Sequence, residues 1–172
     1  TQERGRVIMT DITATLVKEL RESTGVGMMD CKKALKETDG DIDKAVQYLR
    51  EKGMAAAVKK SDRVTNEGRI FIAVNGNKGC IFELGCETDF VSSNDNFKTL
   101  GNDLVNLIVS SNVADKAALE ATELNGKTVK ETLAEAVLKV GENIVVGKWE
   151  IIEGESIDGY THSNGKMGAI VA

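Results

Sequence analysis

The chain has 172 residues, of which 41% are hydrophobic and 28% charged, a composition typical of a folded protein with enough length to bury a core. Its formal net charge is −5, and its basic doublets are Lys32-Lys33 and Lys59-Lys60. Because binding to a phosphate backbone depends on clustered Lys and Arg, direct recognition of DNA or RNA is disfavoured. No apolar run approaches the roughly 20 residues that cross a bilayer, so we expect no membrane partner.

The cysteines and the single histidine give no metal-binding pattern. Cys31, Cys80 and Cys86 are odd in number and lack Cys-x-x-Cys spacing, and His162 has no other histidine to join it as a ligand. Reduced thiols are the simplest account, which favours a cytoplasmic protein. The sequence therefore predicts no metal site and no cofactor of its own.

The first part of the chain has a helical pattern. Residues 1–9 lack the apolar core of a signal peptide, and we expect them to be a leader or disordered extension. From residue 10 to 54, apolar residues recur at spacings of three and four and predict three helices, joined by turns at residues 25–27 and 39–40. We expect the third helix to start after Asp41 and to end at Gly53. Residues 55–67 then read as a linker, although residues 54–60 could extend the helix.

Beyond the linker the pattern changes to strands. An Asn75-Gly76 turn between apolar runs predicts a β-hairpin of residues 69–74 and 79–86. We expect helices over about 96–110 and 127–140, and a strand over 144–152. Residues 68–154 are thus predicted to form a core domain in which helices pack on an antiparallel sheet, and the whole chain to be α+β.

The end of the chain repeats the first hairpin. When Asn75 is laid over Asn164, two following glycines and an isoleucine coincide at the same offset. Residues 155–172 are therefore predicted to start a second core subdomain related to the first. This copy stops before its helix, so we expect either a truncated repeat or a hairpin that completes one mixed sheet.

The stretch from Cys86 to Val91 places an acid and a large aromatic residue where a buried strand gives way to polar residues. Asp89 could cap a turn while Phe90 folds beneath the next helix, as apolar residues near helix starts often do. Alternatively, Phe90 is exposed for a functional reason. The residues alone leave both interpretations open.

Four segments resemble motifs of bacterial elongation factor Ts, in the order of that family and at similar spacing. They are residues 20–35 (LRESTGVGMMDCKKAL), 88–91 (TDFV), 140–144 (VGENI) and 160–162 (YTH). The resemblance spans residues 10–172. It implies an amino-terminal bundle like a ubiquitin-associated domain, a linker and a core of two related subdomains. Longer members of the family continue through a full second subdomain and a helical hairpin, whereas this sequence stops early in the second subdomain.

The resemblance also implies a function. Members of this family are guanine nucleotide exchange factors for elongation factor Tu, so the chain is expected to act on a partner GTPase rather than to be an enzyme itself. Thr88, Asp89, Phe90 and Val91 would form the loop that dislocates the Mg²⁺ of the partner, with Phe90 as an apolar wedge and Asp89 as a polar contact. The Mg²⁺ and the nucleotide would belong to the partner.

The resemblance implies further contacts with the GTPase domain, each of which has a simpler structural alternative. His162 could instead be an ordinary turn histidine, and the loop Gly141-Glu142-Asn143 a helix end with Gly141 in the left-handed conformation. Core packing could account for Met28 or Met29, and Lys32 could belong to a solvated face. Leu16 and Val17 are additional candidates.

Other functions are weaker matches to the sequence. A passive binding module, with a bundle that recruits a partner and an inert core, is the main alternative. An RNA-binding adaptor conflicts with the acidic charge. A thiol enzyme lacks a recognisable base near Cys86. The chain could also act as a homodimer or in a two-plus-two complex with its partner.

Overall fold

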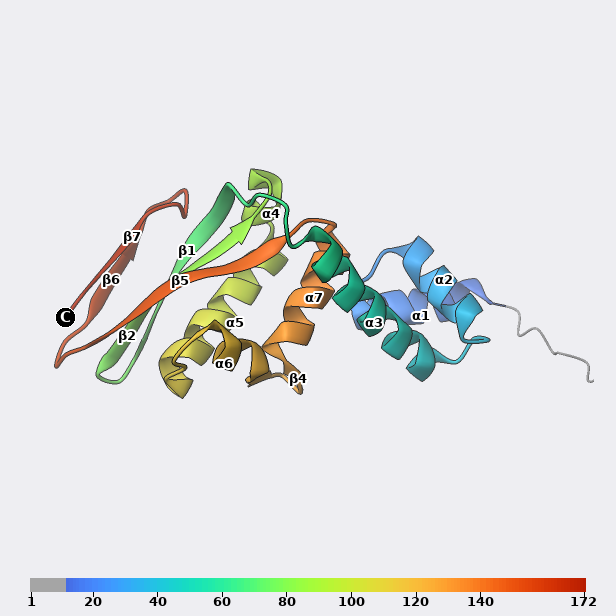
Figure 1. Ribbon diagram of the computed structural model, residues 1–172, viewed down its shortest axis with the longest axis horizontal. Helices are drawn as coiled ribbons and strands as arrows, with labels where there is room; N and C mark the ends of the chain where they lie inside the picture. The colour runs from blue at the N-terminus through green and yellow to red at the C-terminus, as the bar shows by residue number, and fades with distance from the viewer. Residues whose placement is uncertain (1–11) are drawn as a thin grey trace, which may run out of the picture.

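The computed structural model describes residues 12–172, so the predicted leader of residues 1–9 lies outside the described part. The chain has an α+β fold, as predicted. Figure 1 shows an elongated molecule with a helical bundle at one end and stacked strands at the other. None of the helices in the described range is long and apolar enough to span a membrane.

The bundle consists of α1 (Ala14–Thr24), α2 (Met28–Glu37) and α3 (Ile42–Lys60). The side chains of Thr13 and Asp41 cap α1 and α3 by accepting backbone N–H bonds, and Gly25 ends α1 with φ of 66°. Buried apolar residues from all three helices form a separate core, including Leu20, Cys31, Ala34, Leu35, Ala45 and Leu49. The three predicted helices are therefore confirmed.

The predicted end of the third helix was wrong. Gly53 is buried in the middle of α3, and a Cβ atom there would lie 3.1 Å from the carbonyl oxygen of Ala134 in α7 (Val129–Val140). Glycine in a helix costs about 1 kcal/mol relative to alanine, but here its missing side chain lets two helix backbones approach closely. Half of the expected linker is consequently helical, and the irregular connection starts after Lys60.

Three antiparallel strands form the main sheet in the order β1-β2-β5, with bounds β1 (Glu67–Asn75), β2 (Lys78–Cys86) and β5 (Ile144–Glu153). Asn75 pairs with Lys78 across the predicted tight turn, where Gly76 has φ of 61°. At the other end of β2, Cys86 pairs with Ile144. The predicted hairpin and the last core strand are both confirmed.

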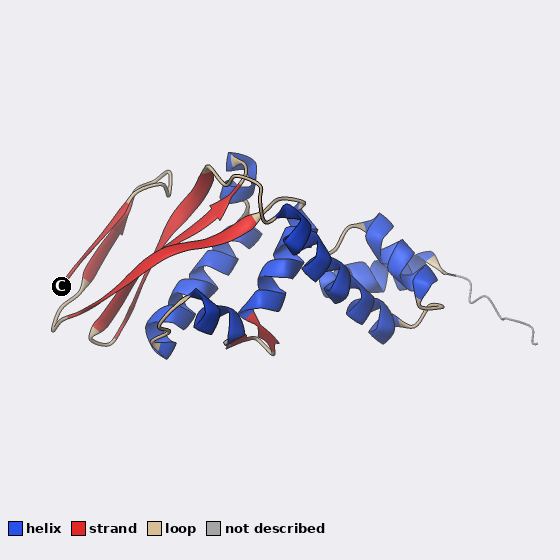
Figure 2. Ribbon diagram, in the orientation of Figure 1, coloured by secondary structure: helices blue, strands red, loops and turns tan. Residues whose placement is uncertain are grey.

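Helices cover one face of this sheet, as Figure 2 shows. The helix α5 (Asp95–Ser111) packs directly on β1, where a Cβ atom on Gly101 would overlap the ring of Phe71. Phe71 in turn lies between Phe82 and Phe97, with ring centroids 6.3 and 6.5 Å away. Three short elements that the sequence did not predict follow α5: α6 (Lys116–Ala121), β3 (Glu123–Leu124) and β4 (Lys127–Thr128).

The last hairpin consists of β6 (Asp158–Thr161) and β7 (Gly168–Val171). Its turn contains Gly165 with φ of 71°, like Gly76 in the first hairpin. However, β6 and β7 form a sheet of their own instead of completing a mixed sheet. Figure 1 shows this sheet stacked on the face of β1 and β2 that α5 does not cover.

Glycines explain why the two layers stack so closely. A Cβ atom on Gly79 of β2 would lie 2.6 Å from a methyl group of Ile170 and 2.7 Å from one of Ile157. A Cβ atom on Gly159 of β6 would likewise lie 2.6 Å from Ile72 of β1. Isoleucine side chains from each layer thus occupy space that glycines of the other layer leave free, and burial of this apolar surface favours stacking over edge pairing.

Candidate functional site

The loop after β2 leads into a short helix, α4 (Asp89–Ser93). Thr88 is its N-cap, since the hydroxyl oxygen accepts a hydrogen bond from the backbone N–H of Val91 at 3.4 Å. The interpretation in which Asp89 caps a turn is therefore wrong: Thr88 is the cap, and Asp89 is the first helical residue with an exposed side chain. An acidic residue in the first turn is favourable beside the helix amino terminus.

Phe90 points into solvent and is 85% exposed. The next residues of α4 face inward, because Ser92 is buried and Val91 packs against the core. Successive positions on a helix are about 100° apart, so a helix with these two residues inside must turn Phe90 outward. Phe90 consequently does not fold beneath α5, so that interpretation was wrong, and the expectation that Phe90 is exposed is confirmed.

The loop after α7 contacts the start of α4. Gly141 ends α7 with φ of 77°. The next residue, Glu142, accepts two hydrogen bonds from Thr88: one from the hydroxyl at 2.6 Å and one from the backbone N–H at 3.1 Å. Two segments predicted separately as partner-binding, residues 88–91 and 141–143, are thus joined in the structure.

Asn143 is buried, with only 4% of its surface exposed. Its side-chain amide donates to the carbonyl oxygens of Ser61 at 3.3 Å and Arg63 at 2.9 Å, and its backbone N–H donates to Glu87 at 2.7 Å. Arg63 also lies 3.5 Å from the Glu87 carboxylate. Asn143 therefore fastens the connection between bundle and core and is not available on the surface as a direct contact.

His162 lies in the turn between β6 and β7 and is half-buried. Its Nδ1 atom is 2.7 Å from the hydroxyl of Tyr160, a pairing that the sequence analysis missed although residues two apart on a strand share a face. Lys166 of the same turn contacts Glu67 at the start of β1, 2.6 Å from nitrogen to oxygen, and this hydrogen bond and charge raise the pKa of Lys166.

The turn of His162 and the loop of Phe90 lie toward the same end of the main sheet (Figure 1). The backbone N–H of Ile70 donates to the carbonyl oxygen of Gly165 at 2.8 Å, which fixes the turn beside β1. Asp89 is close enough for its charge to act on Lys166. The structure therefore brings the predicted residues of α4 and the second hairpin into one neighbourhood.

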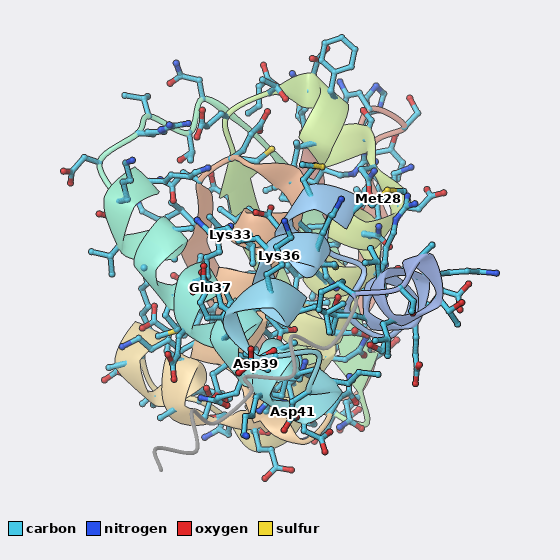
Figure 3. All side chains as sticks on the ribbon, turned by 90° about the vertical axis from the view of Figure 1, so that its right-hand side faces the viewer. Met28, Lys33, Lys36, Glu37, Asp39 and Asp41 are labelled. Carbon is cyan, nitrogen blue, oxygen red and sulfur yellow. The ribbon has the colours of Figure 1, made fainter. Side chains whose placement is uncertain are left out.

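A second surface lies on the bundle, far from α4 along the chain. Met28 and Met29 are 56% and 76% exposed, so the expectation that one of them packs in the core was wrong. They line an open groove between α1 and α2, whose floor includes Val17 and whose rim carries Lys32. Figure 3 looks onto this end of the molecule and shows Met28 at the start of α2, with Lys33 and Lys36 further along the helix.

Leu16 and Val17, the additional candidates on the bundle, are not freely exposed. Val17 is buried and Leu16 packs partly against the bundle core. Flexible methionine side chains suit an adaptable apolar contact, and exposed methionines on a groove are typical of binding surfaces. The two methionines are the large exposed apolar side chains of this groove.

The three cysteines are buried and free. Burial is the main cause that raises the pKa of Cys80 and of Cys86 to about 11, with additional effects of the Glu150 and Glu142 charges respectively. Within residues 12–172, no group of three or more His, Cys, Asp and Glu side chains could hold a metal ion. The structure thus offers no reactive thiolate in its folded form.

We expect these thiols to react slowly with a disulfide reagent at pH 8 in the folded protein and fully in denaturant. The raised pKa values also predict that stability falls as pH rises from about 9 to 11, because the unfolded chain loses its thiol protons before the folded one does. Thiol titration and urea unfolding at several pH values check both results. Rapid labelling of the folded chain at pH 8 would contradict them.

The described part of the chain thus has two exposed candidate surfaces, the Phe90 loop with the second hairpin and the methionine groove on the bundle. Residues 87–172, half of the chain, match the family model described as Elongation factor TS. The matched part contains α4, the Glu142 loop and the second hairpin. The chain therefore belongs to the elongation factor Ts family, whose members are translation factors that generally partner with elongation factor Tu.

Proposed function

We propose that this chain is a guanine nucleotide exchange factor that binds elongation factor Tu in its GDP-bound and nucleotide-free states and promotes release of GDP, so that GTP can bind. The observation that carries the proposal is Phe90, 85% exposed on a capped and hydrogen-bonded loop within the part of the chain that matches the family. A large aromatic side chain held in solvent is poised to be buried against a partner.

The physical logic follows from how a GTPase holds its nucleotide. Phosphate contacts and a Mg²⁺ ion that bridges protein and phosphate oxygens provide much of the affinity. If GDP lowers the affinity of the GTPase for an exchange protein, that protein lowers the affinity of the GTPase for GDP by the same ratio, since coupling between two ligands is reciprocal. Phe90 would enter an apolar slot beside the metal site of the partner and disturb the Mg²⁺, while Asp89 makes a polar contact and Thr88 and Val91 hold the loop.

The other surfaces would complete the interface. His162, oriented by Tyr160, would press on the partner near its phosphate-binding loop. Of the loop 141–143, the exposed Gly141 would contact the GTPase domain directly, while Glu142 and Asn143 would support this contact from within the chain. Met28, Met29 and Lys32 would bind the same domain through the bundle, where thioethers supply apolar area and Lys32 a positive rim.

The proposal includes an organisation and a setting. The bundle of residues 10–54, the core of 68–154 and the related hairpin of 155–172 would act together, with 55–67 as the connection whose first half is helical. The factor would work in the cytoplasm without a cofactor of its own. A homodimer or a two-plus-two complex with the partner is compatible with these surfaces.

Release of a fluorescent GDP from elongation factor Tu tests the proposal. We expect a substoichiometric amount of this chain to release the bound nucleotide over many turnovers in the presence of excess unlabelled GDP. A passive binding module would shift the signal at most in proportion to its own concentration. A folded chain that binds the GTPase without accelerating release would therefore favour the passive module and overturn the exchange proposal.

A further inference from the structure

Two acidic side chains cross between the loop before α4 and the loop after α7. Glu142 accepts from the N–H and hydroxyl of Thr88, and Glu87 accepts from the N–H of Asn143. Each loop thus supplies a carboxylate to a backbone amide of the other. We call these four residues, Glu87, Thr88, Glu142 and Asn143, the clasp.

The clasp continues the sheet beyond its last backbone pair. Cys86 of β2 pairs with Ile144 of β5, and no pairing follows between the two strands after this position. Beyond this pair, β2 continues into Glu87 and Thr88, and β5 is preceded by Asn143 and Glu142. Where the two strands diverge, side-chain carboxylates accept the hydrogen bonds that backbone carbonyls accept within the sheet. They connect the two segments for two further residues.

This arrangement determines the position of Phe90. The Thr88 hydroxyl donates to Glu142 and also accepts from the N–H of Val91, so the clasp and the cap of α4 share one side chain. A five-residue helix is too short to be stable by itself. Because Phe90 contributes almost no packing of its own, its loop is held by these bonds, by the hydrogen bond from the Cys86 thiol to the carbonyl oxygen of Thr88 at 3.2 Å, and by the packing of Val91 and Ser92.

We propose that Glu87 and Glu142 are positioning residues, whose clasp keeps the Phe90 loop in one conformation before the partner is met. This inference rests on the proposed exchange function. Ordering a loop on binding has an entropic cost, which a loop already fixed in the free protein avoids. Both Glu142 oxygens are engaged within the chain, which favours this role over that of a direct contact.

The same clasp reaches the bundle. Asn143 binds the carbonyl oxygens of Ser61 and Arg63, and Arg63 lies beside Glu87. The segment that follows α3 is therefore hydrogen-bonded to the clasp. The clasp thus connects the Phe90 loop to α3, the last helix of the bundle.

Two measurements on Glu142→Ala test the inference. Amide hydrogen exchange of residues 88–93 in the free protein reports the order of the loop, and GDP release reports its effect. We expect the amides to exchange about tenfold faster, which corresponds to about 1.4 kcal/mol of lost local stability. The maximal rate of GDP release should fall about tenfold, while the concentration of elongation factor Tu at half-maximal rate changes less than twofold, because docking through the bundle is retained.

Related variants separate positioning from general damage. Thr88→Ser keeps the hydroxyl, so the amides of residues 88–93 should exchange as slowly as in the unmodified chain. Thr88→Val should speed their exchange. In the Glu142→Ala background Thr88→Val should add little to this effect apart from the loss of the cap, since the partner of the hydroxyl is already gone. Glu155→Ala removes an exposed acid outside the clasp and is the matched control.

The outcomes are distinct from those that test the exchange function. Unchanged amide exchange in Glu142→Ala would overturn the clasp as an ordering device. Faster amide exchange with undiminished GDP release would overturn its role in positioning Phe90 for exchange. If the unmodified chain released no GDP, the proposed function would fail, whereas amide exchange would still show whether the clasp orders the loop.

Discussion

Replacing Phe90 with alanine should lower the maximal rate of GDP release by about 10- to 100-fold, because burial of a phenylalanine side chain against a partner contributes roughly 1.5–3 kcal/mol. Stability should be unchanged, since the side chain is 85% exposed and packs against little in the free chain. Release of fluorescent GDP from elongation factor Tu and thermal unfolding of the free variant measure the two effects.

Val58→Ala is the control for this prediction. Val58 is 74% exposed on α3, so the change also removes exposed apolar surface, but it lies outside the surfaces assigned to the partner. We expect ordinary GDP release from it. A Phe90→Ala variant that is folded and as active as the unmodified chain would show that the aromatic ring does not drive release.

Replacing Phe82 with alanine should have the opposite effects. Phe82 is 1% exposed at the centre of β2, and we expect the free energy of unfolding to fall by about 3–5 kcal/mol, as for other large-to-small changes in cores. Its neighbour Phe71 is held between Phe82 and Phe97 and lies against Gly101, so the cavity cannot close by a small shift of that ring. Urea unfolding measures the loss.

The two phenylalanine variants form a matched pair, because the chemical change is identical. At a temperature where Phe82→Ala remains folded, its rate of GDP release should stay near that of the unmodified chain, as the ring does not reach the surface. A loss of less than about 1 kcal/mol would indicate that the core relaxes around the missing ring. A large loss of exchange in the folded variant would show that the loop depends on the sheet core more than the clasp implies.

Much of the fold could be predicted because local signals agree with the tertiary structure. The Asn75-Gly76 turn and the apolar runs around it predict β1 and β2, and the sequence also predicts the helices α5 and α7. The end of α3 could not be predicted in this way. Gly53 is a helix-ending signal in isolation, and only its contact with Ala134, 81 positions away, shows that it serves close packing.

The candidate site was predicted unevenly for a similar reason. Phe90 could be singled out because an aromatic among polar residues is conspicuous, and motif resemblance pointed to Glu142. The sequence could not show that Asn143 is buried or that Glu87 reaches it, because both depend on how two loops 56 positions apart meet. Core packing of either Met28 or Met29 was considered and neither is buried, since helical spacing alone does not tell which side of a short helix faces the core.

The close packing of α3 on α7 has a consequence for any protein that touches both the methionine groove and the Phe90 loop. Lys60 at the end of α3 donates to the carbonyl oxygen of Gly141, so the bundle is connected to the core by a packed helix and not by a flexible linker alone. Once one surface is engaged, the other is presented at a high effective concentration and at a single spacing. A protein whose two matching sites lie at a different separation would then contact only one of the two surfaces at a time.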